Sequence, residues 1–301
     1  MTGDLKDNNM KKYITIIAAL AALMSCQKED RTDLPLHDDG QIRFEMGMVS
    51  TKATATGFEA GDEVALYAVE YASDDAPELQ IAGNYLNNEK LTYDGSSWSA
   101  ASTLYWSDAA CDFYAIYPYI DLTSVDEHYF EVATDQNSEG APGGYEASDI
   151  LWAKAERVSQ ADGAVSLQFK HMMSKCIVTV TKGPKFEGEI PDDIVCHIYN
   201  TSTSAMLNFA GGSVEKDAMG ARKTITMKKL NNERFEAVVV PQNIERRTPL
   251  IEVTMGGIAY LLEYSLSFKP GYAHTINLIL NTSPDQEKIE ISIDAGTGEW
   301  N

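Results

Sequence analysis

The sequence predicts an all-β protein made of two β-sandwiches. Past residue 40, apolar and polar residues alternate in most runs, and this period of two is the pattern of strands with one buried face. Turn-forming residues separate the runs, and no stretch of this region holds a helical period for three turns. Many short strands with turns between them are typical of sandwiches. A chain of 301 residues is long for one such domain and long enough for two.

The predicted strands follow one another along this region. The first carries four apolar residues on one face: Ile42, Phe44, Met46 and Met48. The same alternation marks residues 165–169, 276–280 and 289–293. Two runs, 64–69 and 113–117, are apolar on both faces, which fits the centre of a sandwich or a junction between domains. Asp94-Gly95, between residues 91–93 and Trp98, predicts a tight hairpin.

The boundary between the two sandwiches is expected at residues 171–175. One set of strands ends at Phe169, and the next set begins at Cys176. We therefore expect an N-terminal sandwich over residues 41–172 and a C-terminal sandwich over residues 173–301.

The start of the chain has the layout of a secretory signal. Lys11 and Lys12 are followed by an apolar run from Tyr13 to Met24. As a helix this run is about 18 Å long. It is shorter than the hydrocarbon core of a bilayer, which is about 30 Å thick. We expect residues 1–25 to be a signal peptide, with residues 1–9 an upstream start-site artefact.

The signal ends in Leu23-Met24-Ser25-Cys26, which resembles a lipobox, the site where lipoprotein signal peptidase cuts before a diacylated cysteine. We predict that Cys26 begins the mature chain and carries its lipid. The alternative is an ordinary signal peptide with an incidental cysteine. Residues 26–40 are polar and charged and contain Pro35, so we expect a flexible tether there.

Charge and motif content narrow the function classes. The net charge of −21 disfavours nucleic acid as a partner, because phosphates and an acidic surface repel each other. The five histidines lack metal-ligand spacing, and no nucleophile elbow, phosphate loop or dinucleotide motif is present in the sequence. Paired aspartates such as Asp192-Asp193 lack the spacing of a calcium loop. We therefore predict no enzymatic activity, cofactor or metal.

Cysteines and clustered aromatics are expected in the core. Cys111, Cys176 and Cys196 each lie in an apolar, strand-like stretch. Three allow at most one disulfide, and the favoured interpretation is three small buried hydrophobes. The aromatic residues of 105–106 and 113–119 fit either core packing or an exposed sugar-binding platform, and their density inside strands favours the core.

Eight phrases, taken in order, resemble the fimbrillin family and especially its Mfa-like branch. They are FEAGDEVALY (58–67), LTYDGSSW (91–98), LYW (104–106), DFYAIYPY (112–119), DILWA (149–153), LQFKH (167–171), VPQ (240–242), and FKPGY (268–272) leading to TINL (275–278). The resemblance implies two transthyretin-like sandwiches in tandem. It also implies a fimbrial subunit or fimbria-associated adhesion protein that travels to the outer membrane as a lipoprotein. Gln27-Lys28-Glu29-Asp30 resembles the short signal that exports such lipoproteins to the outer face of the cell outer membrane.

The resemblance also implies assembly by strand exchange. In the family a protease cuts after a basic residue and removes the first strand, and a strand from a neighbouring subunit fills the groove. An emptied groove with unpaired backbone groups is a site for β-augmentation. The removable strand expected here presents Ile42, Phe44, Met46 and Met48, and the expected donor strand presents Ile289, Ile291 and Ile293. The alternative is that both are ordinary edge or core strands.

One departure from the family concerns processing, which usually follows an arginine in the loop after the first strand. That loop, 50–57, offers Lys52 and no arginine, and the nearest arginines are Arg31 and Arg43. Either a lysine-tolerant protease cuts at Lys52, or the first strand stays in place, as suits an anchor or accessory subunit.

Two functions follow from the sequence. The leading one is a structural or accessory fimbrial subunit on the cell surface, with sister subunits as partners, a membrane link through Cys26, and a host or glycan receptor. The other is a surface lipoprotein that binds glycans or host molecules and never polymerises. Stalk, anchor and tip roles stay open.

Overall fold

The computed structural model describes residues 40–49, 57–75, 77–140, 142–282 and 291–300. Within these residues the chain is almost entirely β-structure, since only α2 (Gly144–Ser148) and the short 3-10 helix η1 (Gln160–Asp162) are helical. The all-β prediction is confirmed. Gly40–Asn301 form one compact unit, and the predicted signal peptide and most of the predicted tether lie outside the described residues.

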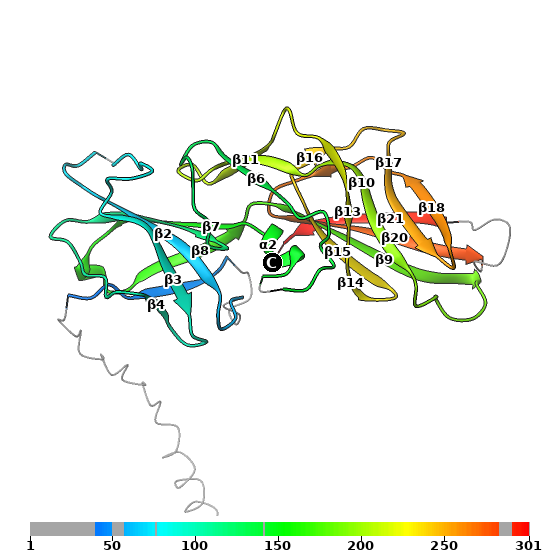
Figure 1. The fold of residues 1–301 in the computed structure, drawn as a ribbon, viewed down its shortest axis with the longest axis horizontal. Coiled ribbons are helices and arrows are strands. Elements are labelled where there is room, and N and C mark those ends of the chain that lie inside the picture. The colour runs from blue at the N-terminus through cyan, green and yellow to red at the C-terminus, as the bar shows by residue number, and fades with distance from the viewer. Residues whose placement is uncertain (1–39, 50–56, 76, 141, 283–290, 301) are drawn as a thin grey trace, which may run out of the picture. The chain divides into compact units, whose positions relative to one another are not determined.

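Seven strands from the first part of this unit form one sheet (Figure 1). They are β1 (Phe44–Met48), β2 (Glu63–Glu70), β3 (Leu86–Tyr93), β4 (Trp98–Ala100), β5 (Cys111–Tyr117), β7 (Leu151–Val158) and β8 (Val165–His171). Their order in the sheet is β1-β8-β7-β5-β2-β3-β4. β1 runs parallel to β8, and the other neighbours are antiparallel.

The remaining strands form four further sheets. They are β6 (His128–Glu131), β9 (Ser174–Lys185), β10 (Val195–Ser202), β11 (Ser204–Asn208), β12 (Ser213–Lys216), β13 (Arg222–Thr226), β14 (Lys228–Asn231), β15 (Arg234–Val239), β16 (Gln242–Asn243), β17 (Pro249–Met255), β18 (Ile258–Glu263), β19 (Ser267–Phe268), β20 (Tyr272–Thr282) and β21 (Ile291–Glu299). The sheet orders are β14-β15-β9-β20-β21, β13-β10-β17-β18, β12-β11-β6 and β16-β19.

β6 links the two parts of the chain. It comes before the predicted boundary, yet it pairs with β11, so that Phe130 lies opposite Ala205. The residues around it are buried with the C-terminal strands: Leu122, Val125, Val132 and Ile150. The predicted boundary at 172/173 falls between β8 and β9, but this crossing segment belongs to the second core. The division into two tandem sandwiches stays a prediction.

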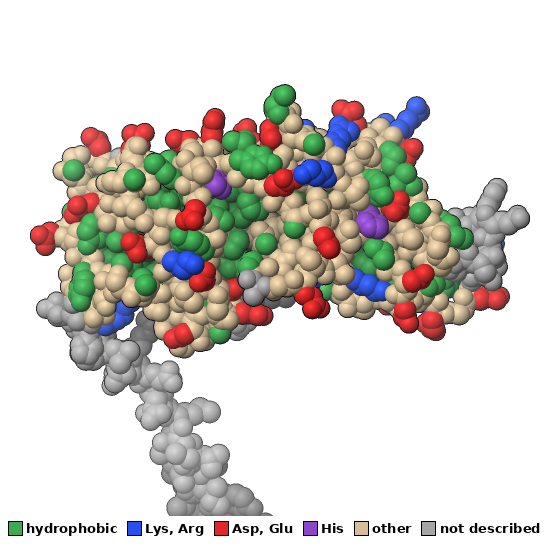
Figure 2. Space-filling view, in the orientation of Figure 1, with side chains coloured by type: hydrophobic (Ala, Val, Ile, Leu, Met, Phe, Trp, Pro, Cys, Tyr) green, Lys and Arg blue, Asp and Glu red, His purple; other side chains and the backbone are tan. Residues whose placement is uncertain are grey.

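Acidic side chains spread over the visible face of the molecule, with fewer Lys and Arg among them (Figure 2). This distribution agrees with the net charge of −21. The negative surface opposes binding of phosphate-rich partners at ordinary ionic strength.

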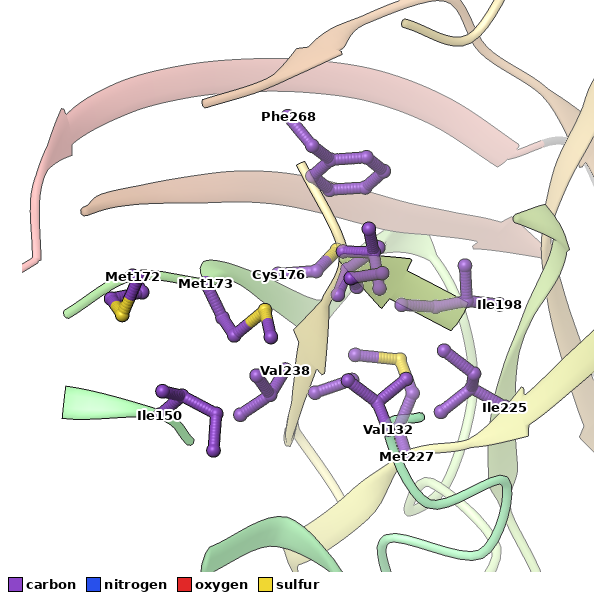
Figure 3. Packing of buried hydrophobic residues seen from close by; sticks show 14 of the residues in the cluster. Val132, Ile150, Met172, Met173, Cys176, Ile198, Ile225, Met227, Val238 and Phe268 are labelled. Carbon is purple, nitrogen blue, oxygen red and sulfur yellow. The ribbon is translucent and has the colours of Figure 1, made fainter. Parts of the chain in front are cut away.

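β2 separates two hydrophobic cores. Its residues alternate sides along the strand, so Val64, Leu66 and Ala68 enter the core under the seven-stranded sheet. Ala65, Tyr67 and Val69 enter the second core with the C-terminal strands. Figure 3 shows that second core, in which Val132 and Ile150 lie near Met173, Val238 and Met227. Strand β5 is buried on both faces as well, so the two runs predicted to be apolar on both faces are enclosed on both sides.

The Asp94-Gly95 turn joins β3 to β4 as predicted. Tyr93 lies opposite Trp98, and the Asp94 amide donates to the Ser97 carbonyl oxygen at 3.1 Å. The Asp94 carboxylate accepts bonds from the backbone amides of Ser96 and Ser97, each at 2.7 Å, and these bonds hold the pKa of Asp94 well below its ordinary value. Gly95 has φ of +98°, which favours glycine at this position.

The predicted core residues are largely where the sequence suggested. The thiols of Cys111, Cys176 and Cys196 are buried and free, and burial raises the pKa of Cys176 to about 12. Phe113 and Tyr114 are buried, as the core interpretation predicts. Tyr105 differs, because 54% of it is exposed.

Candidate functional site

β1 lies at one edge of the seven-stranded sheet and is fastened to β8 along its length. The Val165 amide donates to the Arg43 carbonyl oxygen and the Val49 amide donates to the Phe169 carbonyl oxygen, each at 2.8 Å. The segment before β1 has a second attachment, since the Ile42 amide donates to the Leu104 carbonyl oxygen at 2.8 Å. The ladder to β8 therefore fastens β1 along its length, and the bond from Ile42 fastens the residues just before it.

The four apolar residues predicted for the first strand share one face. Ile42 and Met46 are 7% and 6% exposed, while Phe44 and Met48 are half-buried against the same core. The Phe44 ring meets the edge of Phe113 at 6.3 Å between centroids. Removal of this strand would uncover an apolar trough floored by residues that are now fully buried: Val165, Leu167, Phe169 and Phe113.

β21 lies at the edge of the five-stranded sheet and pairs antiparallel with β20. Ile291 lies opposite Leu280, and Ile293 lies opposite Leu278. Ile289, the third predicted donor residue, lies outside the described residues. The described part of the predicted donor segment, from Ile291 onward, is thus paired within its own chain in this structure, in a different sheet from β1.

The ends of β1 and β21 meet at one cavity of about 410 Å³. Met48 and Val49 line it from the end of β1, and Glu299 and Trp300 line it from the end of β21. The floor includes His171 at the end of β8, together with Met172, Gly271 and Tyr272. The structure therefore brings the two predicted exchange strands together at their C-terminal ends, although it places them in separate sheets.

Sequence reasoning missed the residues that build this corner. The His171 ring stacks on the Trp300 ring at 3.8 Å between centroids, with 9° between the planes. His171 Nδ1 also lies 2.8 Å from an Asp149 carboxylate oxygen. A tryptophan just after the last alternating run was the one visible signal, and nothing local to it pointed to His171.

The remaining predicted residues contribute little chemistry. Cys26 and Lys52 lie outside the described residues. His274 is buried and accepts a hydrogen bond from the Lys269 amide at 3.2 Å, and burial, followed by the Lys269 charge, lowers its pKa. Across the described ranges no cluster of three metal-ligating side chains is found, and none of their helices has the length and apolar character to cross a bilayer.

Comparison with known proteins identifies the family. The Fimbrillin-like family matches residues 51–300 of the chain. The chain belongs to the Fimbrillin-like family. Among proteins similar to this fimbrillin-like chain, a candidate fimbrium tip subunit of Bacteroides ovatus, Fim1C, is 30% identical over 148 residues. That match covers 43% of this chain and 26% of the length of Fim1C.

Crystal structures support the family fold. Two candidate cell adhesion proteins, from Bacteroides uniformis and Bacteroides ovatus, each resemble the chain with a TM-score of 0.66. They are 23% and 15% identical to it. The matches cover 87% of this fimbrillin-like chain and 100% and 97% of those proteins. At this identity the likeness shows the fold.

Proposed function

We propose that this fimbrillin-like chain is a structural or accessory subunit of fimbriae that assembles by β-strand exchange and serves cell adhesion. The observation that carries the proposal is β1, an edge strand whose apolar face lies in the first core. The segment that leaves it, residues 50–56, contains Lys52, a basic residue for a processing protease. Catalysis has no part in this function.

Energetics make a processed subunit dependent on a new strand. Full burial of one Met, Ile or Phe side chain stabilises a fold by about 1.5–3 kcal/mol. Two such residues are buried and two are half-buried in the β1 segment, so their loss removes roughly 5–9 kcal/mol. A domain's whole stability is about 5–15 kcal/mol. A subunit without this strand therefore gains strongly from a replacement that restores both the apolar contacts and the ladder to β8.

The proposed donor is the C-terminal segment with Ile289, Ile291 and Ile293. It has the same period of two as β1, so its isoleucines would all face one side of the groove. The proposed membrane link is lipid on Cys26, which places the unprocessed subunit at the outer face of the cell outer membrane. The proposed partners are sister fimbrial subunits and, at the cell surface, a host or glycan receptor.

A second candidate function is glycan binding by a subunit that never polymerises. Tyr85 and Tyr105 are 36% and 54% exposed, and the Tyr85 hydroxyl donates to the Tyr105 carbonyl oxygen at 2.7 Å. Neighbouring exposed aromatic rings suit stacking on the apolar face of a sugar. Binding to a glycan array that is lost in Tyr105→Ala, by a protein that stays monomeric after cleavage, would favour this function.

Cleavage and the N-terminus test the first proposal. Lysine-specific proteolysis of the purified chain should produce a heat-resistant ladder on a denaturing gel. Lys52→Gln should prevent the ladder, and deletion of residues 285–301 should abolish it while cleavage proceeds. A matched control is Lys28→Gln, which removes a tether lysine and should leave the ladder intact. If cleaved subunits with an intact C-terminus stay monomeric, strand exchange is wrong. The N-terminus of the protein from cells, Ala53 or lipidated Cys26, separates a processed stalk subunit from an anchor.

A further inference from the structure

The last five residues of β21, 295–299, have few side-chain anchors. Residues 295–299 are all exposed, and two of them are glycines, Gly296 and Gly298, with nothing within 4 Å of an added Cβ. The hydroxyl of Thr297 lies 3.2 Å from His274 Nδ1 and supplies one side-chain contact. The backbone ladder to β20 therefore carries most of the attachment in this stretch.

Trp300, directly after β21, is the residue of 295–300 that packs into the protein. It is half-buried, and its ring packs against the second hydrophobic core. Its amide donates to the Gly271 carbonyl oxygen at 2.9 Å, and its ring lies on His171. The Lys175 ammonium also lies 5.6 Å from the centroid of this ring, within cation–π range.

Both partners of Trp300 are themselves fixed. His171 lies 2.8 Å from Asp149, and Lys175 lies 2.6 Å from the buried carboxylate of Glu236. A stacked ring whose partners are already ordered is held with little further loss of side-chain freedom. We call Trp300 with His171 and Lys175 the C-terminal clamp.

We propose that Trp300 is the positioning residue that keeps β21 on its own subunit, and that strand donation requires the C-terminal clamp to open first. The proposal rests on the proposed strand exchange for its consequence, but the clamp itself can be tested without it. The end of an edge strand opens locally more easily where its side chains make few contacts, as at residues 295–299. Anchoring that end by an aromatic stack therefore suppresses peeling more than an equal contact in the middle would.

The cavity beside the C-terminal clamp is also the cavity at which β1 ends. Val49 is bonded to Phe169, two residues before His171, and Met48 and Val49 line the same cavity as Trp300. Loss of β1 removes one wall of that cavity and the bond next to His171. The C-terminal clamp should therefore weaken when cleavage removes β1 and opens the groove that β1 filled. Release of the donor strand would then follow processing.

Hydrogen exchange of the full chain, read on the amides of β21, tests the clamp. Trp300→Ala removes both the ring stack on His171 and the buried area of the indole, so we expect exchange of the amides at the end of β21 to speed by about tenfold. We expect this acceleration in Trp300→Ala, a smaller one in Trp300→Phe, and an intermediate one in His171→Ala. Tyr129→Ala, which removes an exposed ring on β6, is the matched control and should change nothing in β21. Amides of β5 should keep their protection in every variant, which shows that the fold is intact.

Equal β21 exchange in Trp300→Ala and Tyr129→Ala would overturn the proposal. In the cleavage assay, Trp300→Ala should form its ladder faster than the parent chain, and an unchanged or slower rate would also overturn it. If the parent chain forms no ladder under any condition, the proposed strand exchange fails. The hydrogen-exchange measurement then tests the C-terminal clamp independently of strand exchange.

Discussion

Met46→Ala is the sharpest test of the packing of β1. Met46 is 6% exposed, and it lies opposite Leu167 in the register of β1 and β8. Truncation of a buried Met to Ala removes transfer free energy and leaves a cavity, at a cost of about 2–5 kcal/mol. Because β1 is an edge strand that relaxes more easily than a central strand, we expect about 2–4 kcal/mol.

Glu45→Ala is the matched control, since Glu45 is exposed on the same strand. A surface change of this kind should stay within about 0.5 kcal/mol. Guanidinium unfolding of the unprocessed chain measures both variants, and an unchanged m-value would show that the loss belongs to the folded state. A Met46→Ala effect as small as that of Glu45→Ala would refute the packing argument.

The same pair of variants reports on assembly. If β1 leaves on processing, Met46→Ala weakens the unprocessed chain but leaves the heat stability of the ladder unchanged, because the residue is absent from the polymer. If β1 stays in place, Met46→Ala lowers both the stability of the unprocessed chain and the heat stability of the ladder. The comparison therefore separates a processed stalk subunit from a subunit that keeps its first strand.

Three further predictions follow from other contacts. Burial raises the pKa of Glu236, but Lys175 and Arg234 together lower it below its ordinary value. The ionised Glu236 therefore stabilises the fold at pH values above its pKa in the unfolded chain. This stabilisation is lost as the pH falls through its pKa in the folded chain. Glu236→Ala should cost about 2–4 kcal/mol in thermal unfolding at pH 7, because Lys175 stays largely buried without its partner. Asp94→Asn should weaken the β3–β4 hairpin at neutral pH and have no effect in strong acid, where the parent carboxyl is protonated too, and faster amide exchange of β4 would report it. The three buried cysteines should resist a thiol reagent in the folded chain and react fully in guanidinium, and labelling of the native protein would contradict their burial.

The proposed strand exchange would place opposite requirements on β1 and β21. β1 is packed by its side chains, whereas the described side chains of β21 are exposed up to Trp300. A strand packed in that way leaves only when the chain is cut and a replacement is available. Residues 295–300 are held by the ladder, by the contact between Thr297 and His274 and by the Trp300 ring, and under the proposed exchange this end would leave when the ring is released. The difference fits the proposed donor role of β21, because a donor strand must stay paired in a free subunit and still transfer to a neighbour.

The sequence by itself determined the local geometry of this protein. The period of two placed Ile42 and Met46 on an inward face and predicted both buried faces of β2, because successive side chains of a strand point to opposite sides whatever the strand pairs with. Asp94-Gly95 determined its turn for a similarly local reason. The Asp94 carboxylate accepts a bond from an amide two residues on, and Gly95 takes the positive φ of the turn, so no distant part of the chain is required.

Only the tertiary structure decided which elements meet. Nothing in the pattern of 128–131 shows that β6 pairs with β11, because antiparallel partners are selected by loop closure and by side chains far away in the chain. The same holds for the corner where Trp300 stacks on His171 beside the end of β1. The sequence therefore suggested the two strands of the proposed exchange. The tertiary structure shows that both strands end at one cavity, and that Trp300, the residue proposed to retain β21, stacks on His171 more than a hundred positions away in the chain.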